Sequence, residues 1–412
     1  MIKSLVELRS PAAPAAAARA APVALVRDVR ALVDFVPAWE ELAAQALEPN
    51  VFYEHWMLLP ALGAFRAGSD TCVALVPTPR AGARRDAGTL GAVVPLTFVP
   101  HWRRLNVSAV RLWQHPHCYL CAPLLRADCA AESLAALLEW LRRLGRATLL
   151  ELPGIPAEGP FHDLLLDCCK QLGLATWRTE SYTRGLWRQS TGGSDPGPAV
   201  SGALRRRLRR HERRLCEQGR LEHVAPRPGD DIGRWIDEFL ALEASGWKGA
   251  SGSALACSEP GRRYFTRIVT EAFRRQRLSM LGLDYDGRPI ARRCAFLAGD
   301  GAFAFKTAYD ERFAAYSPGA ILEIDNLTQL MALPQVRWMD SCAAPDNLLV
   351  NRIANARRAI CDLAIAVSPL GKLALTALRL LRWTTRRYLR RISPDIPTTT
   401  GVKDHVCSQP LS

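Results

Sequence analysis

The residues best suited to take part in a reaction lie together in the segment 281–322. Lys306, Tyr309 and Asp310 end one apolar run, and the turn Tyr316-Ser317-Pro318-Gly319 precedes the next. An ammonium, a phenol and a carboxylate at the end of a strand can bind an anion or transfer a proton. The chain has six lysines among its 54 basic residues, so a lysine in this segment indicates a use for a compact ammonium.

The turn at residues 316–319 has the composition of a helix start. We expect Ser317 to cap a helix over 320–333, Pro318 to take its first position, and Gly319 to let a ligand approach the backbone. Free amides and the positive end of a helix dipole favour a pyrophosphate. An ordinary turn into a helix has the same composition, so both interpretations stay open on this pattern alone.

Alternating and apolar runs place these residues on a sheet. The second half predicts strands over 278–285, 289–297 and 302–309, a helix over 320–333 and a strand over 336–340. Asp286-Gly287 and residues 299–301 have the composition of hairpin turns. The first half predicts the same order, so we expect an α/β fold with an internal duplication. In the first half we expect strands over 23–26, 72–76, 92–99, 110–113 and 147–152, and helices over 29–47, 55–65, 131–144 and 161–172.

Four separated motifs resemble the CelD-type acetyltransferase family of the GNAT superfamily, which is distantly similar to Fem-type aminoacyl transferases. The motifs are residues 239–243 with 246–249 and 252–254, residues 287–291, residues 305–310 with 316–319, and Asp340. The resemblance covers about residues 203–367 and extends more loosely to the first half. It implies tandem GNAT-like domains, each a mixed, mostly antiparallel sheet flanked by helices.

The resemblance also implies a division of the chain. We expect a flexible Ala/Pro leader over 1–22, a degenerate GNAT-like domain over 23–190, a linker over 191–200 and an acyltransferase domain over 201–368. A basic amphipathic helix and tail would follow over 369–412.

An acyl-CoA donor is the co-substrate that the resemblance implies, with its pyrophosphate at Tyr316, Ser317, Pro318 and Gly319. The usual GNAT phosphate pattern, Gln/Arg-x-x-Gly-x-Gly/Ala, is not present, and only Gly319 stands in for it. That departure leaves the donor open, because Fem-type relatives accept aminoacyl-tRNA.

Acyl transfer needs a base, a group that steadies the oxyanion and an acid for the leaving thiolate. Glu243, Asp310 and Asp340 are the candidate bases, and Tyr309 or Tyr316 is the candidate acid. We place Lys306 in the same catalytic cluster. Trp247 and Lys248 are the candidate acceptor-binding residues. Each of these side chains also fits a solvated charge or a core aromatic, so the prediction rests on the cluster rather than on one member.

Cysteine chemistry is less favoured. An acyl-cysteine route through Cys294 or Cys342 lacks a nearby histidine to activate the thiol. The run His115-Pro116-His117-Cys118-Tyr119-Leu120-Cys121 has zinc ligands but no second pair to complete a tetrahedral site. We therefore expect no metal.

Bulk composition indicates a globular protein with a basic surface. The 412 residues carry a net charge of +14, with 49% hydrophobic and 23% charged residues. No apolar window approaches the roughly 20 residues of a membrane span, and the N-terminus lacks a signal-peptide core. We therefore expect reduced cysteines and a cytoplasmic protein.

Two arginine-rich segments favour anionic partners. Residues 205–214 contain seven arginines around a leucine face, and residues 370–392 interleave leucines, Trp383 and Tyr388 with arginines. The second segment favours peripheral contact with an anionic membrane, at the inner face of the cell membrane. Solvated helix faces are the alternative for both.

Three functions remain after this reasoning. The favoured one is an acyl-CoA-dependent N- or O-acyltransferase acting on a sugar, lipid or polysaccharide precursor. The second keeps the fold but uses aminoacyl-tRNA, with residues 205–214 on the RNA. The third is a non-catalytic basic binding protein, which ranks last because the chain has no recognised DNA-binding motif.

Overall fold

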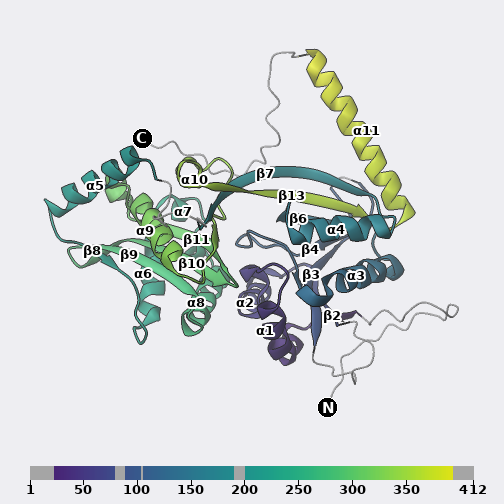
Figure 1. The fold of residues 1–412 in the computed structure, drawn as a ribbon, viewed down its shortest axis with the longest axis horizontal. Helices are drawn as coiled ribbons and strands as arrows, with labels where there is room; N and C mark the ends of the chain where they lie inside the picture. Colours follow the sequence, from purple (N-terminus) through teal and green to yellow (C-terminus); the bar gives the residue numbers. More distant parts are fainter. Residues whose placement is uncertain (1–22, 79–88, 104, 190–199, 393–412) are drawn as a thin grey trace.

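A computed structural model describes residues 23–78, 89–103, 105–189 and 200–392, with side chains as far as residue 381. The predicted leader and nearly all of the predicted linker lie outside the described residues. The thirteen strands within them form one mixed sheet, flanked by helices (Figure 1). In spatial order the strands are β1, β2, β3, β4, β6, β13, β7, β12, β11, β10, β9 and β8, with β5 beside β3. The α/β class with a mixed, helix-flanked sheet is confirmed.

The first half supplies one side of the sheet. Its strands are β1 (Ala24–Val26), β2 (Asp70–Pro77), β3 (Leu90–Val99), β4 (Ala109–Leu112), β5 (Leu124–Leu125), β6 (Leu149–Pro156) and β7 (Thr176–Arg188). Its helices are α1 (Val36–Ala44), α2 (His55–Phe65), α3 (Ala130–Leu144) and α4 (Pro160–Gln171). The helix expected over 29–47 is wrong in its first part, which is a 3-10 turn over Val29–Phe35. Pro37 explains where the α-helix begins, because a proline is best accommodated in the first turn of an α-helix.

The second half repeats the order. Its strands are β8 (Leu221–Val224), β9 (Leu278–Tyr285), β10 (Arg288–Ala298), β11 (Gly301–Tyr309), β12 (Trp338–Asp340) and β13 (Ala356–Ala366). Its helices are α5 (Gly202–Cys216), α6 (Ile232–Ser245), α7 (Trp247–Ala250), α8 (Glu259–Arg274), α9 (Pro318–Ala332), α10 (Leu348–Ile353) and α11 (Pro369–Ile392). Asp286 and Gly287 form the first hairpin turn with φ of 49° and 74°, as predicted.

The two halves exchange their last long strands. In each half a strand pairs in parallel with the strand that follows a helix, β4 with β6 and β11 with β12. β13 from the second half then lies between β6 and β7 of the first, while the end of β7 pairs with β12 (Figure 1). The duplication therefore forms one continuous sheet.

Neighbouring arginines on β10 define the two faces of the second half. Arg292 pairs with Glu238 of α6, whereas Arg293 pairs with Glu323 of α9. Successive side chains of a strand point to opposite faces, so α6 and α9 cover opposite faces. On the α6 face the first half contributes α2, whose Phe65 packs edge-on against Tyr264 of α8 at 5.1 Å.

Candidate active site

Strand β11 carries the centre of the predicted site. It pairs with β12 only from Gly301 to Phe303, opposite Trp338 to Asp340, and then continues to Tyr309. Residues 304–309 therefore extend beyond the end of β12 and keep β10 as their ladder partner. Lys306 points to the α6 face, and Thr307 to the α9 face, where its hydroxyl accepts a hydrogen bond from Arg293 at 2.8 Å.

Lys306, Glu243 and Lys248 form an ion cluster under the free half of β11. Lys306 Nζ lies 2.7 Å from Glu243 Oε1, and Lys248 Nζ lies 3.6 Å from the same oxygen. The other carboxylate oxygen of Glu243 accepts the amide of Leu255 at 2.8 Å. Lys248 Nζ also donates to the Thr307 carbonyl at 3.2 Å. Three of the predicted residues are thus brought together, with two positive charges and one negative.

The protonation of Glu243 follows from this cluster. Burial would raise the pKa of Glu243, because its side chain is fully enclosed, but the ammonium groups of Lys306 and Lys248 outweigh burial and hold that pKa below its ordinary value. The carboxylate is therefore charged at neutral pH and bound to cations. This environment favours a positioning role over proton abstraction.

A histidine from the first half lies at the same cluster. Burial and the positive charge of Lys306 lower the pKa of His117 to about 4, so its imidazole is neutral at pH 7. Its ring stacks on Tyr264 at 5.9 Å and lies 6.2 Å from the ring of Phe305. The site of the second half is thus lined by a loop of the first half.

Asp340 is held by two arginines. Its Oδ2 accepts Arg184 Nη2 at 2.7 Å and Arg358 Nη1 at 3.0 Å, and its side chain has no exposed surface. Burial would raise the pKa of Asp340, but Arg184 and Arg358 hold it below its ordinary value. These arginines come from β7 and β13, so Asp340 joins the exchanged strands to the end of β12.

Asp310 lies at the surface, where it starts the 3-10 turn η5 (Glu311–Tyr316). Its side chain accepts the Arg312 amide at 3.0 Å and forms an ion pair with that residue's guanidinium at 2.6 Å. Hydrogen bonding by Arg312 holds the pKa of Asp310 below its ordinary value. Glu311, its neighbour, accepts the Trp247 amide at 2.7 Å and so ties α7 to this turn.

The start of α9 differs from the predicted cap. Pro318 takes the first position as expected, but Ser317 adopts a left-handed conformation with φ 55° and ψ 49°, and its side chain caps no amide. A capping side chain needs an extended backbone, so the predicted role of Ser317 as a cap is wrong. The amides of Ala320 and Ile321 both donate to the Ser317 carbonyl, at 3.0 and 3.2 Å.

Gly319 faces the two residues of β11 on this side. A Cβ added to Gly319 would lie 3.4 Å from the Tyr309 ring and 3.6 Å from the Thr307 methyl group. Tyr309 and Gly319 are therefore neighbours, and the glycine keeps the backbone accessible between them. Tyr316 is turned toward α5, where its hydroxyl lies 3.3 Å from Gln218 and its carbonyl 3.0 Å from His211 Nδ1.

Neither of the two cysteines considered for an acyl-cysteine route is an activated thiol. Burial raises the pKa of Cys294 and of Cys342, so both are neutral thiols. Cys118 and Cys121 lie 3.8 Å apart by their sulfurs, and His115 stacks on Phe65 at 5.1 Å. Within the described part of the chain, no group of three or more potential ligands is placed to hold a metal.

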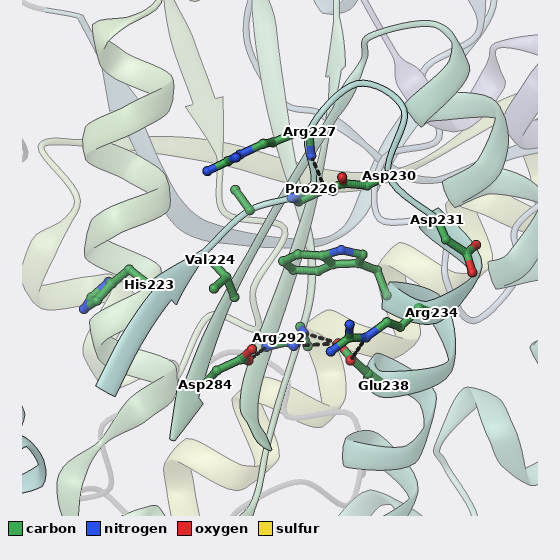
Figure 2. Close-up of a pocket in the computed structure, with 12 residues that line it drawn as sticks. His223, Val224, Pro226, Arg227, Asp230, Asp231, Arg234, Glu238, Asp284 and Arg292 are labelled. Atoms are coloured by element: carbon green, nitrogen blue, oxygen red, sulfur yellow. Dashed lines mark hydrogen bonds and ion pairs between the residues drawn. The ribbon is translucent and has the colours of Figure 1, made fainter. Parts of the chain in front are cut away.

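A cleft of about 680 Å³ opens on the α6 face toward the β8 edge (Figure 2). It is formed by β8 and the loop that follows it, the first turns of α6, and single residues of β9 and β10. Its lining residues are His223, Val224, Ala225, Pro226, Arg227, Asp230, Asp231, Arg234, Trp235, Glu238, Asp284 and Arg292.

The sequence reasoning missed His117 as a site residue and missed the cleft. A signal for the polar base of the cleft existed, because Arg292 and Arg293 interrupt a strand that is otherwise largely apolar. Such arginines must have partners on both sides of the sheet.

Residues 202–347 match the acetyltransferase (GNAT) domain family. No curated protein matches the chain.

Solved structures share the fold over most of the chain. FemX aligns with a TM-score of 0.51 at 10% identity, over 82% of this chain and 98% of its own. A conserved protein of unknown function from Bacteroides thetaiotaomicron VPI-5482 aligns with a TM-score of 0.50 at 13% identity, over 80% and 97%. A tandem GNAT protein from the clavulanic acid biosynthesis pathway gives a TM-score of 0.43 at 15% identity, over 84% and 99%.

The second half of the chain therefore contains a GNAT acetyltransferase domain, within a fold that FemX shares. This class of domain is that of acetyl- and other acyltransferases, which typically use acyl-CoA.

Proposed function

We propose that the chain is an acyl-CoA-dependent N- or O-acyltransferase that transfers an acetyl or longer acyl group directly to a sugar, lipid or polysaccharide precursor. The observation that carries this proposal is the GNAT domain over residues 202–347, with an ion cluster on one face of β11 and the start of α9 on the other. Within the GNAT superfamily, the CelD-type family remains the relative that we propose.

The donor would lie along residues 304–309 of β11, the part that extends beyond β12. Its pyrophosphate would approach the backbone at Gly319, beside Tyr309 and Thr307. The donor anion would also be near α5, an arginine-rich helix that contacts η5 through His211. Because the left-handed Ser317 does not act as a cap, we assign to Gly319 the role of making room for the phosphates.

The reaction would proceed by direct attack. The acceptor nitrogen or oxygen attacks the thioester carbonyl carbon, the carbon–sulfur bond breaks, and the acceptor loses a proton as the thiolate gains one. Lys306 and Lys248 supply fixed positive charge for the oxyanion, because Glu243 holds both ammonium groups in place. Tyr309 is our candidate for the proton donor to sulfur. Glu243, Asp310 and Asp340 each hold a basic partner, so we assign them positioning roles.

Binding of the donor tests this proposal. Acetyl-CoA and longer acyl-CoA thioesters should protect the protein from thermal unfolding in a saturable manner. Transfer should then be measured as release of free CoA thiol in the presence of amino sugars, sugars and lipid precursors. Failure of every acyl-CoA to bind would remove the proposal.

The position of α5 supports a second candidate, in which aminoacyl-tRNA is the donor. Most of its arginines are exposed, while Leu208 and Leu215 are buried against the domain, and the helix contacts η5 beside the start of α9. Binding of tRNA with a steep dependence on salt, without binding of acyl-CoA, would favour this donor.

Helix α11 supports a peripheral membrane location at the inner face of the cell membrane, for a cytoplasmic protein. It extends from the body of the molecule (Figure 1), and Leu370, Leu373, Leu380 and Leu381 are each between 54% and 68% exposed. The helix has no acidic residue, and Lys372 and Arg379 flank the leucines. Exposed apolar and basic side chains on one helix fit the surface of an anionic bilayer. None of the described helices combines the length and apolar character that crossing a bilayer requires.

A further inference from the structure

The lining of the cleft beside β8 has no excess of positive charge. Of the charged lining residues, Arg227, Arg234 and Arg292 are basic and Asp230, Asp231, Glu238 and Asp284 are acidic. The imidazole of His223 instead pairs with Glu212 and with Asp325 of α9, on the opposite face of the sheet. Figure 2 shows Arg292 joined to Asp284 and Glu238 by ion pairs, with His223 pointing away from them. A site for a nucleotide or phosphate would carry a surplus of positive charge. This cleft has no surplus, which favours an uncharged ligand.

The base of the cleft is rigidly built around Arg292, which is 1% exposed. Its Nε and Nη2 donate to Glu238 Oε2 at 3.0 and 2.5 Å, and its Nη1 lies 2.7 Å from Asp284 Oδ1. Arg234 Nε donates to the other oxygen of Glu238 at 2.8 Å. Gly282 makes room for this network, because a Cβ at that position would overlap the Arg292 guanidinium. The polar groups are therefore preorganised before any ligand arrives.

An aromatic side chain completes the lining. Trp235 is half-buried, and the Arg292 guanidinium carbon lies 4.7 Å from its ring centroid. An indole packs well against the C–H face of a pyranose ring, while fixed carboxylates and guanidinium groups bond to its hydroxyls. Trp235, Glu238 and Asp284 offer both kinds of contact in one cleft of about 680 Å³, a volume within the range of small-molecule sites.

The cleft and the ion cluster of the active site lie on the same face of the sheet. Glu238 and Glu243 are both on α6, about 7.5 Å apart along the helix axis from the helical rise. Arg292 of β10 and Lys306 of β11 point to the same face of the sheet, each paired with one of these glutamates. The lining of the cleft ends at β10, so an acceptor bound there must extend beyond the cleft to reach β11.

We infer that this cleft binds an uncharged pyranose unit of the acyl acceptor, with Trp235 against the sugar ring and the carboxylates of Glu238 and Asp284 at its hydroxyls. The role of this sugar as the acyl acceptor rests on the proposed function, but its binding in the cleft does not depend on the donor. A second sugar unit would extend over the rim that Arg227 and Asp230 form, where the Arg227 amide donates to Asp230 at 2.7 Å.

The test is binding of named glycosides without acyl-CoA. Saturation-transfer NMR and calorimetry should detect the methyl glycosides of glucose, galactose and N-acetylglucosamine, and they should bind more tightly than glucose 6-phosphate. Trp235→Leu should weaken that binding at least about tenfold, and Trp235→Phe by less. Trp140→Leu is the matched control, because Trp140 is also half-buried on a helix but lies in α3 of the first half.

Three results would overturn the inference: no uncharged glycoside binds at millimolar concentration, glucose 6-phosphate binds more tightly, or Trp235→Leu binds as well as Trp140→Leu. The donor is tested separately by acyl-CoA protection from unfolding. Glycoside binding without acyl-CoA binding would refute the acyltransferase proposal and leave the cleft assignment standing. Acyl-CoA binding without glycoside binding would refute the cleft assignment and leave the acyltransferase proposal standing.

Discussion

Replacing Lys306 by methionine tests whether its ion pair with Glu243 holds the candidate active site together. Glu243 is enclosed, and the ammonium of Lys306 lies 2.7 Å from its oxygen. Methionine keeps an apolar stem of similar length and removes the charge. Breaking a buried ion pair by removing one partner costs about 3–5 kcal/mol. We expect the free energy of unfolding to fall by about 3 kcal/mol, because Lys248 remains 3.6 Å from the carboxylate.

The loss should depend on pH in a fixed direction. Burial raises the pKa of Glu243, but Lys306 and Lys248 bring it below the ordinary value. A carboxyl with a depressed pKa in the folded state contributes stability above its unfolded pKa, about 4.3, and loses it as the pH falls through the folded value. The difference in free energy of unfolding between wild type and Lys306→Met should therefore be full at pH 7 and shrink below about pH 4.

Urea unfolding at several pH values measures this difference. Lys248→Met is the comparator, because its ammonium is farther from Glu243 and 24% exposed, so its loss should be smaller. Acyl transfer by the folded Lys306→Met protein should also fall, by about 10²-fold if the ammonium steadies the oxyanion. A free energy of unfolding within about 0.5 kcal/mol of wild type at pH 7, or a loss that is the same at every pH, would refute the reasoning.

Four further predictions follow from other parts of the structure. Asp340→Asn should lower the free energy of unfolding by about 3–5 kcal/mol, since two arginines lose their buried partner; unchanged stability with lost turnover would instead make Asp340 a base. Hydrogen bonds to Asp325 and Glu212 raise the pKa of His223 to about 10; its stabilisation is present below the unfolded pKa of about 6.5 and lost as pH rises through 10, so the deficit of His223→Gln in urea unfolding should disappear at high pH. Gly319→Ala should fold normally, because the added Cβ makes ordinary contacts, but it should weaken acetyl-CoA binding in calorimetry; equal affinity would argue against a phosphate at this turn. Leu373→Asp with Leu380→Asp should abolish sedimentation with phosphatidylglycerol vesicles, while wild type should not sediment with phosphatidylcholine alone; retention by the double variant would exclude α11 as the contact.

Local pattern was sufficient for much of the fold. The hairpin at Asp286-Gly287 and the helix start at Pro318 appear where the sequence predicts them, because turn chemistry and apolar periodicity act over a few residues. The failure at Ser317 is also local. Its residue type fits a cap, but the preceding turn η5 sets a left-handed backbone that a composition pattern does not reveal.

Long-range pairing could not be predicted in the same way. The sequence placed Glu243 and Lys306 in one cluster only through resemblance, and their direct contact depends on how α6 crosses β11. His117 belongs to an incomplete zinc-ligand pattern in the sequence, yet it lies beside Lys306 because a loop of the first half reaches the second half. No spacing within one segment carries that information.

The arginines of β10 could be predicted in part from the sequence. Two adjacent basic residues in an apolar strand indicate that each face of the sheet has a buried acidic partner. The identity of those partners, Glu238 and Glu323, follows only from the packing of α6 and α9.

Because β13 lies between β6 and β7, neither half of this molecule has a complete sheet of its own. A polypeptide ending at residue 189 would expose the facing edges of β6 and β7 to chance partners, and one starting at residue 200 would carry β13 with no neighbour at all. We therefore expect the separate fragments to aggregate when each is produced alone and to recover a native assembly only when both are present from the start. Synthesis on the ribosome faces the same condition, because β6 and β7 must wait for a strand that emerges near the end of the chain.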